Sequence, residues 1–166
     1  MLKKGFTLIE LLIVIAIIAI LAGVVFVSLD PGKRFAAARD AARWTDVTAV
    51  LSAIKVNQVD LGGAYLDGPA GQSIADLTAD IKYMIGTATS GCNDASCSAV
   101  TADANCVDLS SLSSGGYLAN IPVSPNATGD SWGDDLTGYY MSRNTNGSIT
   151  VAACHYEGTE AITVNR

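Results

Sequence analysis

The longest hydrophobic pattern in the chain is a continuous apolar run near its start. From Leu11 to Val27 there are 17 consecutive residues without a charge, and the run extends to Leu29 if Ser28 is included. In a helix, about 20 such residues cross the roughly 30 Å hydrocarbon layer of a membrane. Two lysines, Lys3 and Lys4, precede the run. By the positive-inside rule we expect the N-terminus to stay in the cytoplasm and the rest of the chain to lie outside.

A second helix is predicted from Lys33 to Leu61, because apolar residues recur there at i, i+3, i+4 and i+7. Pro31-Gly32 predicts a kink or break before this helix, and Gly62-Gly63 ends it. One face of the helix is expected to pack on a core, and its apolar stripe consists of Val47, Val50, Leu51, Ile54 and Leu61.

Four charged residues on this helix lie three, four or seven positions apart, a spacing at which opposite charges pair on a helix surface. They are Arg39, Asp40, Arg43 and Asp46. We interpret them first as a solvated helix face and, as the alternative, as a contact between subunits.

The second half of the chain predicts a short helix followed by a sheet. Amphipathic spacing favours a short helix from Ser73 to Ile85. Leu136 to Arg143 and Ser148 to Tyr156 flank Asn146-Gly147, which is typical of a hairpin turn, and Ala161 to Val164 is expected to add a third strand. The fold class is therefore α+β, with a long N-terminal hydrophobic helix whose C-terminal half packs on a small antiparallel β-sheet.

The charge balance argues against some classes of function. The formal net charge is -6 with a pI near 4.5, and from Val56 onward there are 3 basic and 12 acidic residues. Proteins that bind nucleic acid through their own surface use Lys and Arg to displace counterions, so no direct nucleic acid binding is predicted. The single histidine and the lack of a GxxxxGKS/T motif or a recognisable nucleophile and base pair predict that the protein is not an enzyme.

Glu10 places a carboxylate at the start of the apolar run. Such a charge costs about 2.5 to 3.5 kcal/mol at mid-bilayer and is normally retained where it has a partner. An ordinary secretory signal peptide is the simpler alternative, but its cleavage site should follow the apolar run. The best candidate, ending at Ala22, has Ile20 where a small residue is needed.

The string Lys3-Lys4-Gly5-Phe6-Thr7-Leu8-Ile9-Glu10 continues directly into the apolar run as far as Leu21. Over these positions the chain resembles the class III signal of type IV pilins and type II secretion pseudopilins. A weaker resemblance, from Tyr117 to Pro125 and from Thr137 to Tyr140, is to the tail of small bacterial members of the same family.

The resemblance implies a processing step and an assembly role. In that family a prepilin peptidase cuts on the cytoplasmic side of the apolar segment, and the new N-terminal residue is methylated. Carried over to this chain, the cut falls between Gly5 and Phe6, Phe6 becomes N-methylated, and Glu10 is the assembly glutamate. The retained helix then becomes the filament core, where a buried carboxylate needs a cation, and the nearest is the ammonium on Phe6 of a neighbouring subunit.

The four cysteines, Cys92, Cys97, Cys106 and Cys154, all fall on the side expected to leave the cytoplasm, where an even count favours disulfides. A zinc site is the alternative, but Cys106 and Cys154 form no second close pair and His155 is the only imidazole. Four cysteines allow three pairings. Many pilins link their C-terminal region similarly, and by that resemblance we expect Cys106 to pair with Cys154 and Cys92 with Cys97.

Asp130, Asp134 and Asp135 form a weak calcium candidate, because calcium prefers several hard oxygen ligands. Major pseudopilins, which this chain resembles, place a calcium site in a comparable C-terminal loop. The string lacks the EF-hand spacing and its bidentate glutamate, so a solvated acidic turn is the alternative. No other metal or cofactor is expected.

By the same resemblance, residues 1–5 are expected to form a leader peptide and residues 6–29 a transmembrane and filament-core helix. Residues 30–166 are expected to form a globular head, with the amphipathic helix at 33–61 and the sheet at about 136–164. The expected function is that of a structural subunit of a type IV pilus-like filament, serving adhesion, twitching motility or DNA uptake. Its expected partners are copies of itself, the prepilin peptidase and the inner-membrane assembly platform.

The precursor is expected in the cytoplasmic membrane, and the assembled filament outside the cell on a bacterial surface. Two alternatives stay open at this point. A pseudopilin of a type II secretion system would form a short periplasmic filament. A monomeric, single-pass membrane-anchored binding domain would form no filament and would not be cut at Gly5.

Overall fold

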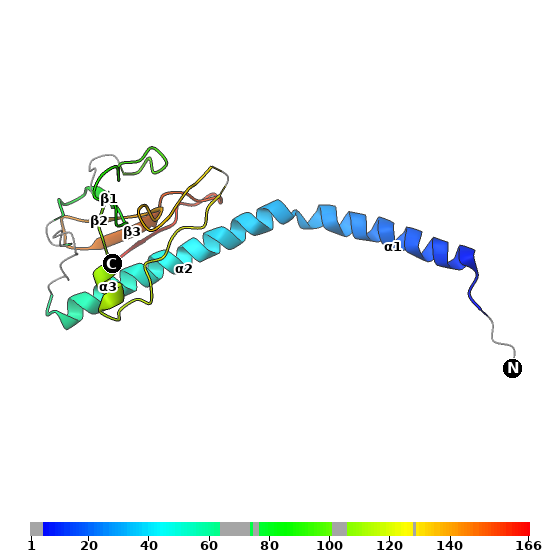
Figure 1. The fold of residues 1–166 in the computed structure, drawn as a ribbon, viewed down its shortest axis with the longest axis horizontal. Coiled ribbons are helices and arrows are strands. Elements are labelled where there is room, and N and C mark those ends of the chain that lie inside the picture. Colours follow the sequence, from blue (N-terminus) through cyan, green and yellow to red (C-terminus); the bar gives the residue numbers. More distant parts are fainter. Residues whose placement is uncertain (1–4, 64–73, 75–76, 101–105, 128) are drawn as a thin grey trace. The chain divides into compact units, whose positions relative to one another are not determined.

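The chain has the predicted α+β layout, with a long N-terminal apolar helix and a four-stranded antiparallel sheet (Figure 1). It divides into two compact units, Met1–Ala37 and Ala38–Arg166. The computed structural model describes residues 5–63, 74, 77–100, 106–127 and 129–166.

Two helices follow each other at the N-terminal end. Helix α1 spans Leu8–Leu29 and helix α2 spans Pro31–Asp60. Asp30, between them, adopts the left-handed conformation with a φ of 39°. The α conformation is disfavoured for a residue that precedes proline, so the break predicted at Pro31-Gly32 falls on the residue just before it.

Helix α2 buries one stripe of apolar side chains against the sheet. Its members Val47, Val50, Leu51 and Ile54 are buried in the main core of the head, as predicted. The prediction for Leu61 is wrong, because the helix ends at Asp60 and leaves this side chain exposed.

The sheet has the strand order β1-β2-β3-β4, and all three pairings are antiparallel. A five-residue helix, α3, covers Ser110–Ser114. The strands are β1 at Lys82–Met84, β2 at Tyr139–Arg143, β3 at Ile149–Ala153 and β4 at Thr163–Asn165.

The predicted hairpin turn joins β2 to β3. Arg143 pairs with Ile149 across the sheet. The Asn144 N–H donates to the Ser148 carbonyl at 2.8 Å, and the Gly147 N–H donates to the Asn144 carbonyl at 2.9 Å. Gly147 has a φ of 84°, a conformation that its missing Cβ permits. The Asn146-Gly147 signal in the sequence therefore identified the turn correctly.

The prediction of a helix from Ser73 to Ile85 is wrong over its last residues. Lys82–Met84 form strand β1, which pairs with β2 in antiparallel register. A short apolar run fits a strand as well as a helix, and here the pairing with β2 decides. Ser73 and Asp76, where the helix was expected to start, lie outside the described residues.

The α2 stripe yields a stability prediction. Ile54 is 0% exposed, whereas Val56 on the same helix is 53% exposed. Ile54→Ala should lower the free energy of unfolding by about 2 to 5 kcal/mol, because it leaves a cavity in the core. Val56→Ala should change it by no more than about 0.5 kcal/mol. Chemical denaturation of the full chain in detergent, followed by tryptophan fluorescence, measures both. Equal losses in the two variants would contradict the assignment of the buried stripe.

Candidate functional site

The start of α1 is closed by a capping box formed by Thr7 and Glu10. The Glu10 N–H donates to Thr7 Oγ1 at 3.3 Å. In return, Glu10 Oε2 accepts from the Thr7 N–H at 2.8 Å and from the Thr7 hydroxyl at 2.7 Å. This reciprocal arrangement satisfies donors that a helix N-terminus otherwise leaves without partners. Sequence reasoning missed Thr7, although the Thr-x-x-Glu spacing before an apolar run is the known signal of such a cap.

The capping box leaves part of the Glu10 carboxylate free. Both donated bonds end on Oε2, so Oε1 has no donor among the described residues. Thr7 supplies neutral donors, which do not cancel the charge of the carboxylate. A cation from outside the chain therefore has an oxygen to approach without breaking the cap.

Gly5 and Phe6 precede the helix, and no side-chain contact holds them within the described part of the chain. Phe6 is 86% exposed, and a Cβ added at Gly5 would meet no atom within 4 Å. The fold itself therefore gives no reason for glycine at position 5.

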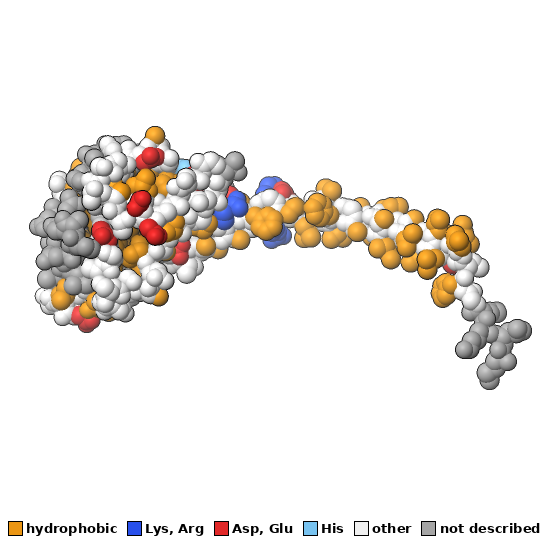
Figure 2. Space-filling view, in the orientation of Figure 1, with side chains coloured by type: hydrophobic (Ala, Val, Ile, Leu, Met, Phe, Trp, Pro, Cys, Tyr) orange, Lys and Arg blue, Asp and Glu red, His pale blue; other side chains and the backbone are white. Residues whose placement is uncertain are grey.

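Helix α1 is apolar around its whole circumference. All of its residues are exposed within the described chain, and Figure 2 shows hydrophobic side chains in orange along its length. Its 22 residues are long enough to cross a membrane, and an 18-residue stretch of them has a mean hydropathy of 3.2. A helix of this kind needs a cover of lipid or of other apolar helices. As a structural element it can act as a membrane anchor or as the centre of an assembly.

The charged residues of α2 form a network with the C-terminal part of the head rather than a solvated face. Arg43 is 0% exposed. Its Nη1 donates to Asp40 Oδ1 at 2.7 Å and to Glu157 Oε1 at 3.1 Å, its Nε to Ser124 Oγ at 3.1 Å, and its Nη2 to the Pro125 carbonyl at 2.8 Å. The interpretation of Arg43 as solvated is wrong, because spacing along one helix carries no information on partners more than eighty residues away.

The Glu157 carboxylate accepts hydrogen bonds from two arginines, Arg39 and Arg43. Arg39 forms a two-pronged contact with it, of which the Nε to Oε1 distance is 2.6 Å, and Arg43 adds the third bond. The hydrogen bonds from Arg39 above all, and then those from Arg43, lower the pKa of Glu157 from 4.5 to about 2. Asp40 completes the network by accepting the backbone N–H groups of Glu157 and Gly158 at 2.7 to 3.1 Å.

A second contact joins α2 to the sheet. The Tyr139 hydroxyl donates to Asp46 Oδ2 at 2.5 Å. Burial raises the pKa of Asp46, and the hydrogen bond from Tyr139 opposes that effect. Burial, followed by the bond to Asp46, also raises the pKa of Tyr139. All four charged residues of the predicted helix face therefore act within the head, or at its surface toward the C-terminal loop.

The four cysteines form two disulfides, but the expected pairing is wrong. Cys92 pairs with Cys106 and Cys97 with Cys154. The cause is the backbone pairing around Val107, which bridges to Ile85 in parallel. The Cys106 N–H then donates to the Ala88 carbonyl at 3.4 Å, four residues before Cys92.

The Cys97–Cys154 bridge has the larger effect on the unfolded chain. It joins residues 57 positions apart, which corresponds to about 4 kcal/mol in the chain-entropy model. Both bridges lie in a small second core, together with Met84, Val100 and Trp132. This core orders a loop that has little regular secondary structure.

The three residues of the calcium candidate make different contacts, and two of them, Asp134 and Asp135, contact Thr87. Asp130 Oδ1 lies 2.7 Å from His155 Nδ1, and Asp135 Oδ1 accepts from the Thr87 hydroxyl at 3.1 Å. Asp134 contributes its backbone carbonyl to Thr87. In the part of the chain that the structure describes, no group of three or more His, Cys, Asp or Glu side chains could hold a metal ion.

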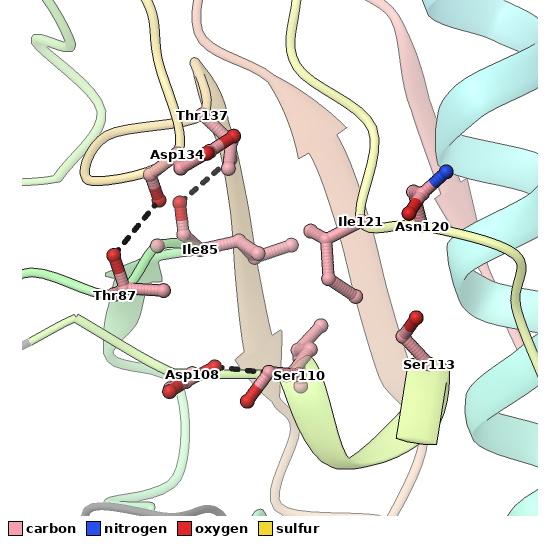
Figure 3. Close-up of a pocket in the computed structure, with 11 residues that line it drawn as sticks. Ile85, Thr87, Asp108, Ser110, Ser113, Asn120, Ile121, Asp134 and Thr137 are labelled. Atoms are coloured by element: carbon pink, nitrogen blue, oxygen red, sulfur yellow. Dashed lines mark hydrogen bonds between the residues drawn. The ribbon is translucent and has the colours of Figure 1, made fainter. Parts of the chain in front are cut away.

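The head has a cavity of about 250 Å³ beside strand β1 (Figure 3). Several of its hydroxyls are already bonded to backbone carbonyls, Thr137 to Ile85 at 2.6 Å and Ser113 to Ala119 at 3.0 Å. The described residues that line the cavity are Ile85, Gly86, Thr87, Asp108, Leu109, Ser110, Ser113, Asn120, Ile121, Asp134 and Thr137.

Residues 1–26 match the family model of the prokaryotic N-terminal methylation motif. This motif is the class III signal peptide of type IV pilins and pseudopilins, and the resemblance read from residues 3 to 21 is thereby confirmed. The matched segment holds Gly5, Phe6 and Glu10 and most of α1. No curated protein and no solved structure matches the chain. The motif supports a precursor of the pilin or pseudopilin type, and it characterises the N-terminal segment alone.

The Glu157 contacts predict an acid dependence of stability. A carboxyl group whose pKa is lowered by folding stabilises the fold above its unfolded-state pKa, and this contribution is lost as the pH falls through the folded-state value. The wild-type chain should therefore lose stability between about pH 4.5 and pH 2. Glu157→Gln should be less stable at neutral pH, and its deficit should shrink over that range.

Glu160→Gln is the matched control, because Glu160 is an exposed carboxylate in the same C-terminal segment. Thermal unfolding followed by circular dichroism at a series of pH values gives the three curves. A Glu157→Gln curve that stays parallel to the wild-type curve down to pH 2 would contradict the role assigned to this carboxylate.

Proposed function

We propose that this protein is the structural subunit of a type IV pilus-like filament on a bacterial surface. It is made as a membrane-anchored precursor, is cut by a prepilin peptidase, and polymerises through its N-terminal helix. The observation that carries the proposal is the methylation motif on residues 1–26, joined to a helix that has no apolar cover of its own within the described chain.

The proposed cut lies between Gly5 and Phe6, ahead of the apolar helix. A cut at this place leaves α1 on the mature chain, and the free ammonium on Phe6 is the proposed site of methylation. Exposure of Phe6 and the open space around Gly5 support this step, because a peptidase must reach the backbone there.

The proposed role of Glu10 is to set the register between neighbouring subunits. Inside a filament core its carboxylate would be a buried charge, which is costly unless a cation meets it. The ammonium on Phe6 of the next subunit supplies that cation, and the free Oε1 is where we place the contact. The capping box persists in this arrangement because it uses Oε2.

Surface localisation tests the filament itself. Material sheared from the source cells should contain a chain that starts at N-methylated Phe6, with a mass four hydrogens below that of the reduced form because two disulfides are present. A chain confined to the membrane fraction and starting at Met1 would instead indicate a monomeric anchored domain. Processed chain found only in membranes would indicate a pseudopilin or a minor subunit.

Three substitutions separate the charge of Glu10 from its capping role. Glu10→Gln keeps the capping box, since Gln can serve at this position of the motif, but removes the charge. Thr7→Ala removes the cap but keeps the charge. We expect Glu10→Gln and Glu10→Ala to leave processed monomers in the membrane and to reduce sheared filament at least tenfold, whereas Thr7→Ala reduces it less. Electron microscopy and immunoblots of sheared fractions give the yields. Normal filament yield from Glu10→Gln would refute the charge pairing.

A substitution at Gly5 tests processing. Gly5→Ser should block the cut, so that the precursor accumulates with its N-terminus at Met1. Gly23→Ser is the matched control, since a Cβ at Gly23 also meets nothing within 4 Å, and this position lies inside the helix away from the cut. N-terminal mass spectrometry of the membrane fraction distinguishes the two. Cleavage of Gly5→Ser at the wild-type rate would remove Gly5 from the processing site.

A further inference from the structure

Two basic residues beyond the membrane-length helix, Lys33 and Arg34, form no ion pair with the part of the head that the structure describes. Lys33, Arg34, Arg39 and Arg43 all lie within 15 residues of Leu29, on the side where the positive-inside rule disfavours basic residues. Arg39 and Arg43 are held by carboxylates of the head. The presence of Lys33 and Arg34 at this place in the chain therefore needs another explanation.

These two residues open α2 together with an exposed aromatic ring. Lys33 Nζ lies 3.0 Å from Asp30 Oδ2, and its side chain is 86% exposed. The exposed Arg34 has no side-chain ion pair in the described part of the chain. Phe35, the next residue, is 66% exposed. Because Asp30 compensates one cation, the segment presents about one free positive charge beside an apolar ring.

The position of the segment fixes the depth at which it lies when α1 spans a membrane. Residues 33 to 35 follow the end of α1 by four to six positions, which corresponds to about 6 to 9 Å at the helical rise of 1.5 Å per residue. The polar headgroup region extends about 5 to 7 Å beyond the hydrocarbon layer on each side. The two cations therefore fall at the level of the lipid phosphates. Figure 2 shows the orange side chains of α1 followed along the chain by basic side chains in blue.

We propose that Lys33, Arg34 and Phe35 form a binding surface for anionic phospholipid headgroups in the membrane leaflet outside the cytoplasm. The cations bind the phosphates, and the Phe35 ring lies among the glycerol and upper acyl groups. The inference rests on the membrane-anchored precursor of the proposed function, and it adds the lipid partner of that stage.

The charge distribution favours lipid as the occupant. From Val56 onward the chain carries 3 basic and 12 acidic residues, so the head is repelled by an anionic surface. A basic residue near such a surface contributes about a fivefold gain in binding, equivalent to about 1 kcal/mol. The Lys33-Arg34 pair lies next to the membrane in the exported chain. It is thus the part that an anionic membrane surface attracts.

Lipid retention by the full-length precursor tests the proposal. The purified chain is placed in mild detergent with equal amounts of phosphatidylglycerol and phosphatidylcholine, and native mass spectrometry counts the lipids that stay bound. The wild-type chain should retain phosphatidylglycerol in preference to phosphatidylcholine. Lys33→Gln with Arg34→Gln should lower that preference about fivefold to thirtyfold.

Two further variants give matched comparisons. Lys82→Gln with Arg166→Gln makes the same change in net charge within the head and should keep the wild-type preference. Asp30→Asn should raise the preference, because it frees Lys33, while asparagine tolerates the left-handed conformation found at this position.

The outcomes separate this inference from the proposed function. Resistance to alkaline extraction from vesicles reports whether each variant inserts into the membrane, and the double variant should still insert. An inserted wild-type chain with no lipid preference, or a preference unchanged in the double variant, overturns the lipid surface and leaves the anchored precursor standing. A double variant with normal lipid preference but fewer filaments would assign these cations to a neighbouring subunit and would likewise overturn the proposal. A wild-type chain that fails to insert removes the anchored precursor itself.

Discussion

A helix that is apolar on every side cannot remain in water, and the rest of this chain is organised around that constraint. Helix α1 has no cover within the described chain, so it needs a cover of lipid or of other apolar helices. The head meets the constraint by folding around its own core, formed by the α2 stripe and the sheet. Neither core cluster of the head includes a residue of α1 among the described residues. The head can therefore stay folded while the environment of α1 changes.

Within the head, the buried Arg43 orders segments that have little regular secondary structure. A guanidinium removed from water needs a partner for each of its donors. Here Asp40, Glu157, Ser124 and the Pro125 carbonyl accept four hydrogen bonds from its three nitrogens. Two stretches of chain that lie far apart in sequence, at 124–125 and 157–158, are thereby held against one helix turn. Apolar packing alone would leave their alignment less well defined, because it has no directional preference.

The sequence predicted what is encoded locally. The membrane-length helix, the break next to Pro31 and the Asn146-Gly147 hairpin each depend on neighbouring residues, and each is present. The methylation motif is likewise a local string, and it carries the most specific statement about function. The Thr7 cap was also readable in this way but was overlooked.

What the sequence did not predict depends on contacts between distant residues. Strand β1 is extended because β2 lies beside it, and Cys92 meets Cys106 because Val107 bridges to Ile85. Arg43 is buried because a loop more than one hundred residues later provides Glu157. In each case the local pattern suited two outcomes, and the tertiary partner decided between them.

The order of the two disulfides along the chain has a mechanical consequence. The bridges Cys92–Cys106 and Cys97–Cys154 overlap in sequence, so residues from Cys92 to Cys154 form one covalently closed block. A force between the two ends of the chain passes from Cys97 directly to Cys154, which lies 57 positions later, and bypasses the residues between them. At about 3.5 Å per extended residue, roughly 200 Å of contour length is withheld from stretching. The chain between Cys97 and Cys154, including strands β2 and β3, is thus shielded from tensile load even when noncovalent contacts give way.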